Sequence, residues 1–316
     1  MTDKTKIYAV VGPTASGKSA LALELAKRYG GEIISCDSMQ IYKRMDIGTA
    51  KPTAAEQSEV KHHLIDVVEP DVSFSCEDYV GLAARAIDDC VSRGKIPIIC
   101  GGTGLYLDTL LRGGNSAPIA DTSEIRAALS VRAENEGAMA LHKELSVVDP
   151  ESAEAIHPNN VKRVIRALEI YYSCGIPKSV LDRQSTEIES RYDASVIGLF
   201  YPQRDILYGR IENRVDIMIN DGLLDETRAL MSEGVFEKNS TAAQAIGYKE
   251  LLGYLRGEES LENAIAELKT ATRRYAKRQI TWFSAKKYVM PLEVTEGNYI
   301  KRFEEIVNNA QKLFSL

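Results

Sequence analysis

The stretch Gly12-Pro13-Thr14-Ala15-Ser16-Gly17-Lys18-Ser19 decides the fold of this chain. It matches the pattern G-x-x-x-x-G-K-[ST], and it stands between the β-rich run 7–11 and residues 19–29, whose apolar spacing is helical. The glycines let backbone N–H groups turn toward one anion, the helix N-terminus adds its dipole, and Lys18 adds a positive charge. In this motif the Ser19 hydroxyl binds Mg²⁺. The stretch therefore predicts a loop for a diphosphate-like group with Mg²⁺, whatever molecule carries that group.

Strand and helix signals alternate over the first hundred residues. A second β-rich run covers 32–36, and the capping box Ser75-x-x-Asp78 begins a helix that ends near Gly94. The third run, 96–100, is continuously apolar, as strands buried in parallel sheets are. This β-α-β-α-β order predicts an α/β fold with a parallel sheet flanked by helices.

The pattern changes after Gly113, where the next eighty residues or so indicate helices without a convincing strand. The predicted helices cover 123–135, 138–145, 150–156 and 161–174. Strand character returns once, at 195–200, and the chain is then predicted to be helical nearly to its end. We therefore predict a P-loop NTPase-like core made of residues 1–113 and 195–316, with an all-helical domain, residues 114–194, inserted between its two parts.

The net charge of −6 excludes a protein that is basic over its whole surface, because 39 Lys and Arg residues stand against 45 Asp and Glu residues. Residues 268–292 differ, since they contain seven basic residues and no acidic one, which leaves the rest of the chain at −13. Pairs such as Arg274 and Arg278 lie one helical turn apart, where like charges repel. Two interpretations fit equally: a site for a polyanion such as nucleic-acid phosphates, and a solvated helix face near acidic neighbours.

Other features of the composition limit the cellular setting. The apolar runs are too short to span a bilayer, and the polar start of the chain lacks the apolar segment of a signal peptide. Five cysteines and four histidines show no paired spacing typical of a zinc site or a disulfide scaffold. The sequence has no coiled-coil pattern. We expect a soluble, cytoplasmic monomer that does not bind membranes.

The ends of the second and third strands carry the candidate chemical groups. A nucleotide hydrolase commonly ends a buried strand with a carboxylate that holds Mg²⁺, whereas the third strand here runs into Gly101-Gly102-Thr103. The second strand ends at Asp37, and the carboxyl ends of parallel strands share the edge where the phosphate loop lies. Asp37 is therefore a candidate for a general base or for a contact to the metal's water shell, and a simple turn-capping role is the alternative.

Several motifs stand in a fixed order along the chain. After the phosphate loop come Asp37-Ser38-Met39-Gln40-Ile41-Tyr42, residues 45–52, residues 62–66, residues 101–106, residues 166–169, residues 245–248 and residues 271–279. In this order they resemble the signature of bacterial tRNA dimethylallyltransferases over nearly the whole chain. The resemblance implies transfer of a dimethylallyl group from dimethylallyl diphosphate to N6 of the adenosine just 3′ of a tRNA anticodon, with release of diphosphate. The phosphate loop would then hold a leaving diphosphate, so no hydrolytic carboxylate is needed.

The resemblance also implies residue roles. Asp37 matches the proposed general base for the N6 proton, Thr103 the hydroxyl that helps to orient the amine, and Lys18 a group that stabilises charge on the leaving diphosphate. The residues implied for diphosphate binding are Gly12, Pro13, Thr14, Ala15, Ser16, Gly17, Lys18, Ser19, Arg204 and Arg210, with Arg214 as a further candidate and Ser19 as the Mg²⁺ ligand. The residues implied for tRNA binding are Asp37, Ser38, Met39, Gln40, Thr103, Arg126, Val161, Lys162, Arg163, Val164, Ile165, Arg166, Arg274 and Arg278. The inserted domain would grip the anticodon stem-loop, and the target adenosine would flip out of its stack.

Three other functions remain open. A small-molecule kinase would suit the first hundred residues alone, and an isopentenyltransferase could act on free adenine nucleotides. Neither of these small acceptors would need a helical insertion or a basic C-terminal helix. A nucleotide-gated RNA-binding module without chemistry predicts that Asp37→Ala leaves every function intact.

Overall fold

The computed structural model describes residues 4–113, 122–187, 190–239, 241–294 and 303–316. The chain divides into two compact units, residues 1–111 with 191–316 and residues 112–190. In the larger unit, the strand predicted at 195–200 begins earlier, at Tyr192, which pairs with Thr5. Backbone pairing therefore extends this strand beyond its apolar run.

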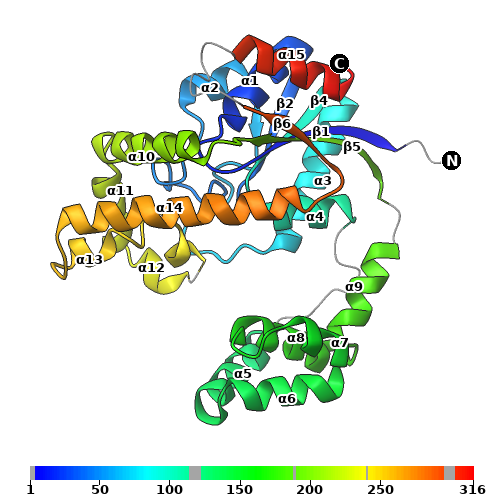
Figure 1. Cartoon of the computed structure of the whole chain (residues 1–316), viewed down its shortest axis with the longest axis vertical. Helices are drawn as coiled ribbons and strands as arrows, with labels where there is room; N and C mark the ends of the chain where they lie inside the picture. Colours follow the sequence, from blue (N-terminus) through cyan, green and yellow to red (C-terminus); the bar gives the residue numbers. More distant parts are fainter. Residues whose placement is uncertain (1–3, 114–121, 188–189, 240, 295–302) are drawn as a thin grey trace. The chain divides into compact units, whose positions relative to one another are not determined.

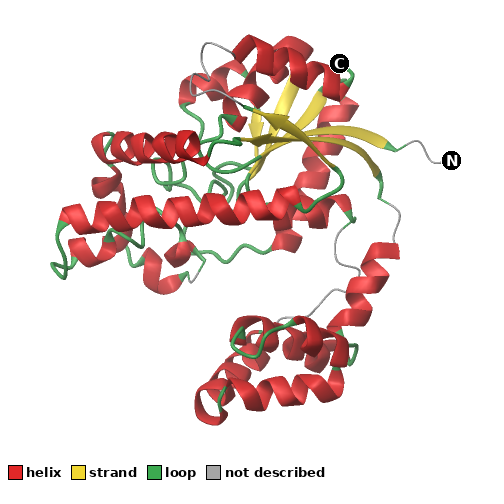
Figure 2. Ribbon diagram, in the orientation of Figure 1, coloured by secondary structure: helices red, strands yellow, loops and turns green. Residues whose placement is uncertain are grey.

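A six-stranded parallel sheet forms the centre of the larger unit, drawn in yellow in Figure 2. Its strands are β1 (Thr5–Val11), β2 (Gly31–Cys36), β3 (His62–His63), β4 (Ile96–Gly101), β5 (Tyr192–Phe200) and β6 (Val289–Glu293). They are ordered β3-β2-β4-β1-β5-β6, so later strands lie on both sides of β1. Every pairing between these described strands is parallel, which confirms the predicted α/β fold. In such sheets ligands bind outside the carboxyl ends of the strands, where the strand order reverses.

Helices cover both faces of this sheet (Figure 1). In the larger unit they are α1 (Lys18–Tyr29), α2 (Ala54–Glu59), α3 (Cys76–Ser92), α4 (Gly104–Leu111), α10 (Arg204–Asn220), α11 (Leu223–Ser232), α12 (Val235–Lys238), α13 (Leu252–Leu255), α14 (Leu261–Ser284) and α15 (Phe303–Phe314), with a 3₁₀ turn at Ala242–Gln244. Side chains alternate along β1: Ile7 and Val11 join a core that includes α3 and α4, and Tyr8 and Val10 join a core that includes α1 and α15. Burial on both faces explains why the central strands are continuously apolar.

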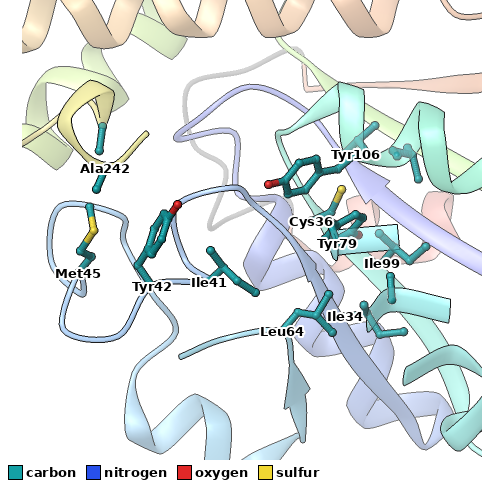
Figure 3. Close-up of a cluster of buried hydrophobic side chains, with 14 of the residues drawn as sticks. Ile34, Cys36, Ile41, Tyr42, Met45, Leu64, Tyr79, Ile99, Tyr106 and Ala242 are labelled. Carbon is teal, nitrogen blue, oxygen red and sulfur yellow. The ribbon is translucent and has the colours of Figure 1, made fainter. Parts of the chain in front are cut away.

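Figure 3 shows how the first of these cores extends past the sheet. Tyr79 of α3 stacks on Tyr106 of α4, with the ring centroids 4.3 Å apart. Tyr42 and Met45 belong to the same core, and so does Ala242 of the 3₁₀ turn. The segment that follows β2 therefore packs into the protein interior through Tyr42 and Met45, although connecting segments usually lie on the surface.

The smaller unit contains only helices among the residues that the structure describes. They are α5 (Ser123–Glu136), α6 (Ala138–Val148), α7 (Pro150–Ala155), α8 (Val161–Cys174) and α9 (Lys178–Glu187). Leu129, Leu141, Leu145 and Leu168 form part of a separate core inside this unit. The predicted all-helical character is confirmed, although α9, a mostly polar segment, was not predicted. In both units, no described helix is at once long enough and apolar enough to cross a lipid bilayer.

The prediction that the chain has a single strand after the insertion is wrong, because β6 follows the basic helix α14. Pro291 weakens the strand signal of β6, since proline donates no hydrogen bond to a sheet. At the edge of the sheet, where β6 lies, a proline is tolerated. The other edge strand, β3, has two residues, which is too few for any periodicity.

Candidate active site

The carboxyl edge of the sheet brings the phosphate loop and Asp37 together. Cys36 at the end of β2 pairs with Gly101 of β4, and Gly101 pairs with Val11 at the end of β1. Asp37 and Gly12, which come next in the chain, therefore leave the sheet at neighbouring points. The shared edge predicted for the loop and the carboxylate is present.

A cavity of roughly 370 Å³ opens at this edge, and all its lining residues belong to the larger unit. The charged and polar groups on its wall include Thr14, Lys18, Ser19, Asp37, Arg214 and Arg278. Apolar groups on the wall include Met39, Ile65, Val215 and Met218. A cavity with cationic and apolar walls suits a ligand that has an anionic group and an apolar part.

Hydrogen bonds from outside the phosphate loop hold it in its curled form. The Tyr201 hydroxyl donates to the Ser16 carbonyl at 3.0 Å, and Arg210 Nε donates to the Ala15 carbonyl at 2.8 Å. Gly17 has a φ of 89°, a left-handed value that favours glycine. Because these two contacts use loop carbonyls, they occupy none of the loop N–H groups that could face an anion.

Two cations of the cavity, Lys18 and Arg214, are half-buried. Lys18 Nζ donates to the Pro13 carbonyl at 3.3 Å. Burial lowers the pKa of Lys18 and of Arg214, and the negative charge of Asp37 opposes the shift in both groups. Removing a cation from water is costly unless the cation is paired, so both half-buried groups favour an anionic ligand beside them.

Asp37 both caps a turn and faces the cavity. Its Oδ1 accepts the Met39 N–H at 2.9 Å, which is the turn-capping role considered above. Thr103 supports the same loop, because its Oγ1 accepts the Ser38 N–H at 3.0 Å and its own N–H donates to the Cys36 carbonyl at 3.1 Å. Asp37 lines the cavity, whereas Thr103 stands just outside the lining residues.

Helix α14 contributes Tyr275, Arg278 and Gln279 to the cavity wall. Burial raises the pKa of Tyr275, and the charge of Asp37 adds to the shift, so this phenol keeps its proton at neutral pH. The Arg278 guanidinium lies over the Tyr275 ring, 5.5 Å from its centroid. Sequence reasoning missed Tyr275 and Gln279 as site residues, although both lie in the motif 271–279.

The three candidate arginines of α10 take different positions. Arg214 lines the cavity. Arg210 instead bonds the backbone of the phosphate loop. Arg204 is exposed at the start of the helix and is not part of the cavity wall, so its diphosphate contact stays a prediction. Of the three, Arg214 is placed to reach a ligand directly.

The basic residues of α14 divide into two groups. Lys269 pairs with Asp216, and Arg273 pairs with Glu212, both at 2.6 Å, on the adjacent helix α10 (Figure 1). The second group has no ion pair with any carboxylate in the described parts of the chain and consists of Arg274, Lys277 and Arg278. The interpretation as a helix face near acidic neighbours therefore fits Lys269 and Arg273, and the polyanion site stays a prediction for the second group.

In the smaller unit, the run 161–166 predicted to bind tRNA is the first half of α8. Lys162 and Arg163 are exposed. Val164 and Ile165 are only 1% and 8% exposed and pack in the core of this unit, so they are not available for contact. The helical period places these two side chains on the inner face, which corrects the prediction for the run as a whole.

Two further predicted arginines of this unit share one buried carboxylate. Arg126 Nη2 and Arg166 Nη1 donate to Glu169 Oε1 at 2.7 and 2.9 Å. Both guanidinium groups remain partly exposed, whereas the Glu169 side chain is 1% exposed. The carboxylate therefore fixes the positions of two cations at the surface of the unit.

The donor set beside the phosphate loop suits a hard divalent cation. Ser19 presents a hydroxyl and Asp37 a carboxylate to the same cavity. Oxygen donors of this kind are the ligands that Mg²⁺ prefers, together with phosphate oxygens. The Oγ of Ser16, a neighbouring loop residue, is also buried and has no hydrogen-bond partner among the described residues.

A second group of possible metal ligands lies outside this cavity. Glu32, His63 and Cys90 bring their ligand atoms within 4.8 Å of one another. Arg93 Nη2 donates to Glu32 Oε2 at 2.7 Å, and His63 Nε2 lies 2.7 Å from the same oxygen. Because Arg93 already holds the carboxylate, we interpret the group as a hydrogen-bonded cluster. The neighbouring His62 lines the cavity instead.

A phosphate loop, a carboxylate at the end of β2 and a partly apolar cationic cavity define a P-loop protein for a diphosphate-bearing substrate. A family model described as IPP transferase matches residues 40–286. The tRNA dimethylallyltransferase of Thermoanaerobacter sp. (strain X514) is 46% identical over 308 residues, which cover 97% of this chain and 96% of the relative. The relative from Halalkalibacterium halodurans is 46% identical over 305 residues, 96% of each chain. The chain belongs to the tRNA dimethylallyltransferase family.

Solved structures agree with this assignment. The full-length tRNA isopentenylpyrophosphate transferase of Bacillus halodurans matches with a TM-score of 0.71 and 43% identity, over 99% of this chain and 97% of the other. A eukaryotic dimethylallyltransferase acting on tRNA matches with a TM-score of 0.81 and 30% identity, over 98% of this chain and 80% of the other. The similarity therefore spans both units of the chain.

Proposed function

We propose that the cavity of the larger unit transfers the dimethylallyl group of dimethylallyl diphosphate to N6 of the adenosine just 3′ of a tRNA anticodon. Family membership makes the chain a prenyltransferase that modifies tRNA. One observation carries the assignment to this cavity: the phosphate loop, two half-buried cations and Asp37 line a single space that also has apolar walls. The diphosphate, the prenyl group and the accepting amine each find suitable chemistry there.

The phosphate loop would hold the diphosphate as a leaving group. When the allylic C–O bond breaks, its electron pair passes to the diphosphate, and Lys18, Arg214 and the loop amides stabilise the new charge. The described residues directly after β4 are Gly102 and Thr103, so this strand end supplies no carboxylate to activate water. The arrangement favours transfer of a carbon group over hydrolysis.

Asp37 would take the proton that N6 loses. N6 forms a bond to the allylic carbon as the C–O bond breaks, and one N6 proton must then leave. The bond from Met39 N–H fixes one oxygen of Asp37, and Thr103 holds the loop through Ser38. Positioned in this way, the Asp37 carboxylate accepts the N6 proton.

Ser19 would hold Mg²⁺ together with oxygens of the diphosphate. When bound, Mg²⁺ supplies positive charge that neutralises the leaving group. Lys18 and Arg214 share this task from the protein side.

The exposed cations would bind the tRNA backbone. Arg274, Lys277 and Arg278 serve this role on α14, and Lys162, Arg163, Arg126 and Arg166 serve it on the smaller unit, which we assign to the anticodon stem-loop. The target adenosine would leave its stack to reach Asp37, as base-modifying enzymes require. We expect a cytoplasmic monomer.

Asp37→Asn tests the assignment, because it keeps the size of the side chain and removes the base. Turnover with tRNA and dimethylallyl diphosphate should fall by about 10²- to 10⁴-fold, while the Kd for tRNA changes less than about twofold. Asp71→Asn, at an exposed loop position, is the matched control and should retain full activity. Comparable turnover in Asp37→Asn would remove Asp37 from the base role, and phosphate released from ATP would favour the kinase.

A further inference from the structure

Gln279 joins helix α14 to two loops at the carboxyl edge of the sheet. Its Oε1 accepts the Thr14 N–H at 2.8 Å, and its Nε2 donates to the Gly102 carbonyl at 3.0 Å. The residue is 5% exposed. One buried amide therefore connects the phosphate loop, the end of β4 and the helix.

The bond to Thr14 bears directly on diphosphate binding. Thr14 lies in the loop whose other N–H groups would face the anion, and its own N–H is held by an acceptor on another helix. The bonds from Tyr201 and Arg210 hold carbonyls of the same loop. Gln279 is thus the acceptor that complements these donors in fixing the shape of the loop.

The backbone around Gly102 is fitted to this amide. A Cβ at Gly102 would lie 2.1 Å from Gln279 Nε2, a distance that forces the amide to move. One turn further along α14, Trp282 lies against Gly104, where a Cβ would stand 2.3 Å from Trp282 Cδ1. Two glycines therefore let α14 approach the β4 end closely enough for Gln279 to reach both loops.

We propose that Gln279 is a positioning residue for the diphosphate. It fixes the orientation of the Pro13–Thr14 peptide in the phosphate loop and the position of α14 relative to that loop. This inference rests on the proposed function, since it concerns the diphosphate of that reaction. It accounts for two features together, the glycine at position 102 and a polar residue buried on the apolar side of a basic helix.

Gln279→Met keeps the length of the side chain and removes both hydrogen bonds. We expect the KM for dimethylallyl diphosphate and the Kd for inorganic diphosphate with Mg²⁺ to rise about tenfold or more, while the KM for tRNA changes less than about threefold. Gln311→Met is the matched control, because Gln311 bonds Tyr29 at the end of α1 opposite to the phosphate loop. The kinetic constants of this variant should stay unchanged. A fall in Tm with unchanged diphosphate affinity would show that Gln279 is only structural and would overturn the proposal.

Gly102→Ala provides an independent test that does not rely on one variant folding well. In the wild-type background it should weaken diphosphate binding about as much as Gln279→Met, because the new Cβ displaces the amide. In a Gln279→Ala background the space is free, so Gly102→Ala should add less than about twofold. Additive effects would contradict the proposal. Transfer of labelled prenyl groups to tRNA by the wild-type protein is measured in parallel. If the wild-type protein transfers label but the variant effects are additive, the role of Gln279 fails and the proposed function stands.

Discussion

The two groups of cations on α14 give a sharp prediction about tRNA binding. Arg274→Gln combined with Lys277→Gln removes two cations that have no ion pair with a described carboxylate. Each phosphate contact contributes about 0.7 to 0.9 to the slope of log K against log salt, so the double variant should lose about 1.4 to 1.8 of that slope. The loss of tRNA affinity in the double variant, relative to the wild-type protein, should consequently be about tenfold smaller at 200 mM salt than at 50 mM salt. Fluorescence anisotropy with labelled tRNA at several salt concentrations measures both quantities.

The matched control removes the same number of charges from the same helix. Lys269→Gln combined with Arg273→Gln affects cations already neutralised by Asp216 and Glu212, so the salt slope should change by less than about 0.5. Equal slopes for the two double variants would refute the reasoning, because ion pairing on α10 would then have no bearing on which residues meet RNA.

Three other substitutions test separate contacts. Arg278→Gln should raise the KM for tRNA and for dimethylallyl diphosphate by about threefold to tenfold, since Arg278 lines the cavity and is also exposed. If steady-state kinetics show an effect on the KM for tRNA alone, Arg278 lies outside the diphosphate site. Arg93→Met should lower the free energy of unfolding at pH 7, because it removes the Arg93 bonds to the buried Glu32 carboxylate. Hydrogen bonds from Arg93, and then from His63 and Cys90, outweigh burial and lower the pKa of Glu32 to about 2, so the stabilisation by Arg93 is present above pH 4.5 and is lost as the pH falls toward 2. Urea unfolding that shows the same difference at every pH would contradict this. Glu226→Gln should lower the free energy of unfolding by about 2 kcal/mol, because Glu226 accepts the N–H groups of residues 46–48 at 2.9 to 3.1 Å. An unchanged urea midpoint would exclude this anchoring role.

The central part of the fold could be predicted because local signals and global structure agree there. The phosphate loop requires glycine at particular backbone angles, and the flanking strand and helix have distinct periods. Asp37 could be placed at the same edge because parallel strands end together. The helices of the insertion followed from their caps and apolar spacing.

The features that could not be predicted, such as β6 and the role of Gln279, depend on contacts between residues distant in the sequence. β6 pairs with β5 despite Pro291, and nothing local shows that an edge strand is needed there. Gln279 is one polar residue in a basic helix until the fold brings Thr14 and Gly102 beside it. Similarly, Arg204 and Arg214 occupy the same helix, and only the tertiary structure shows that Arg214 lines the cavity.

The central claim is that this chain moves a dimethylallyl group from its diphosphate to tRNA. The most direct measurement incubates the protein and Mg²⁺ with unmodified tRNA and dimethylallyl diphosphate labelled in the prenyl group, followed by nuclease digestion and mass spectrometry. We predict label on N6 of the adenosine just 3′ of the anticodon, with one diphosphate released for each label incorporated. Release of diphosphate without label in RNA, or label only in free adenine nucleotides, would contradict the account.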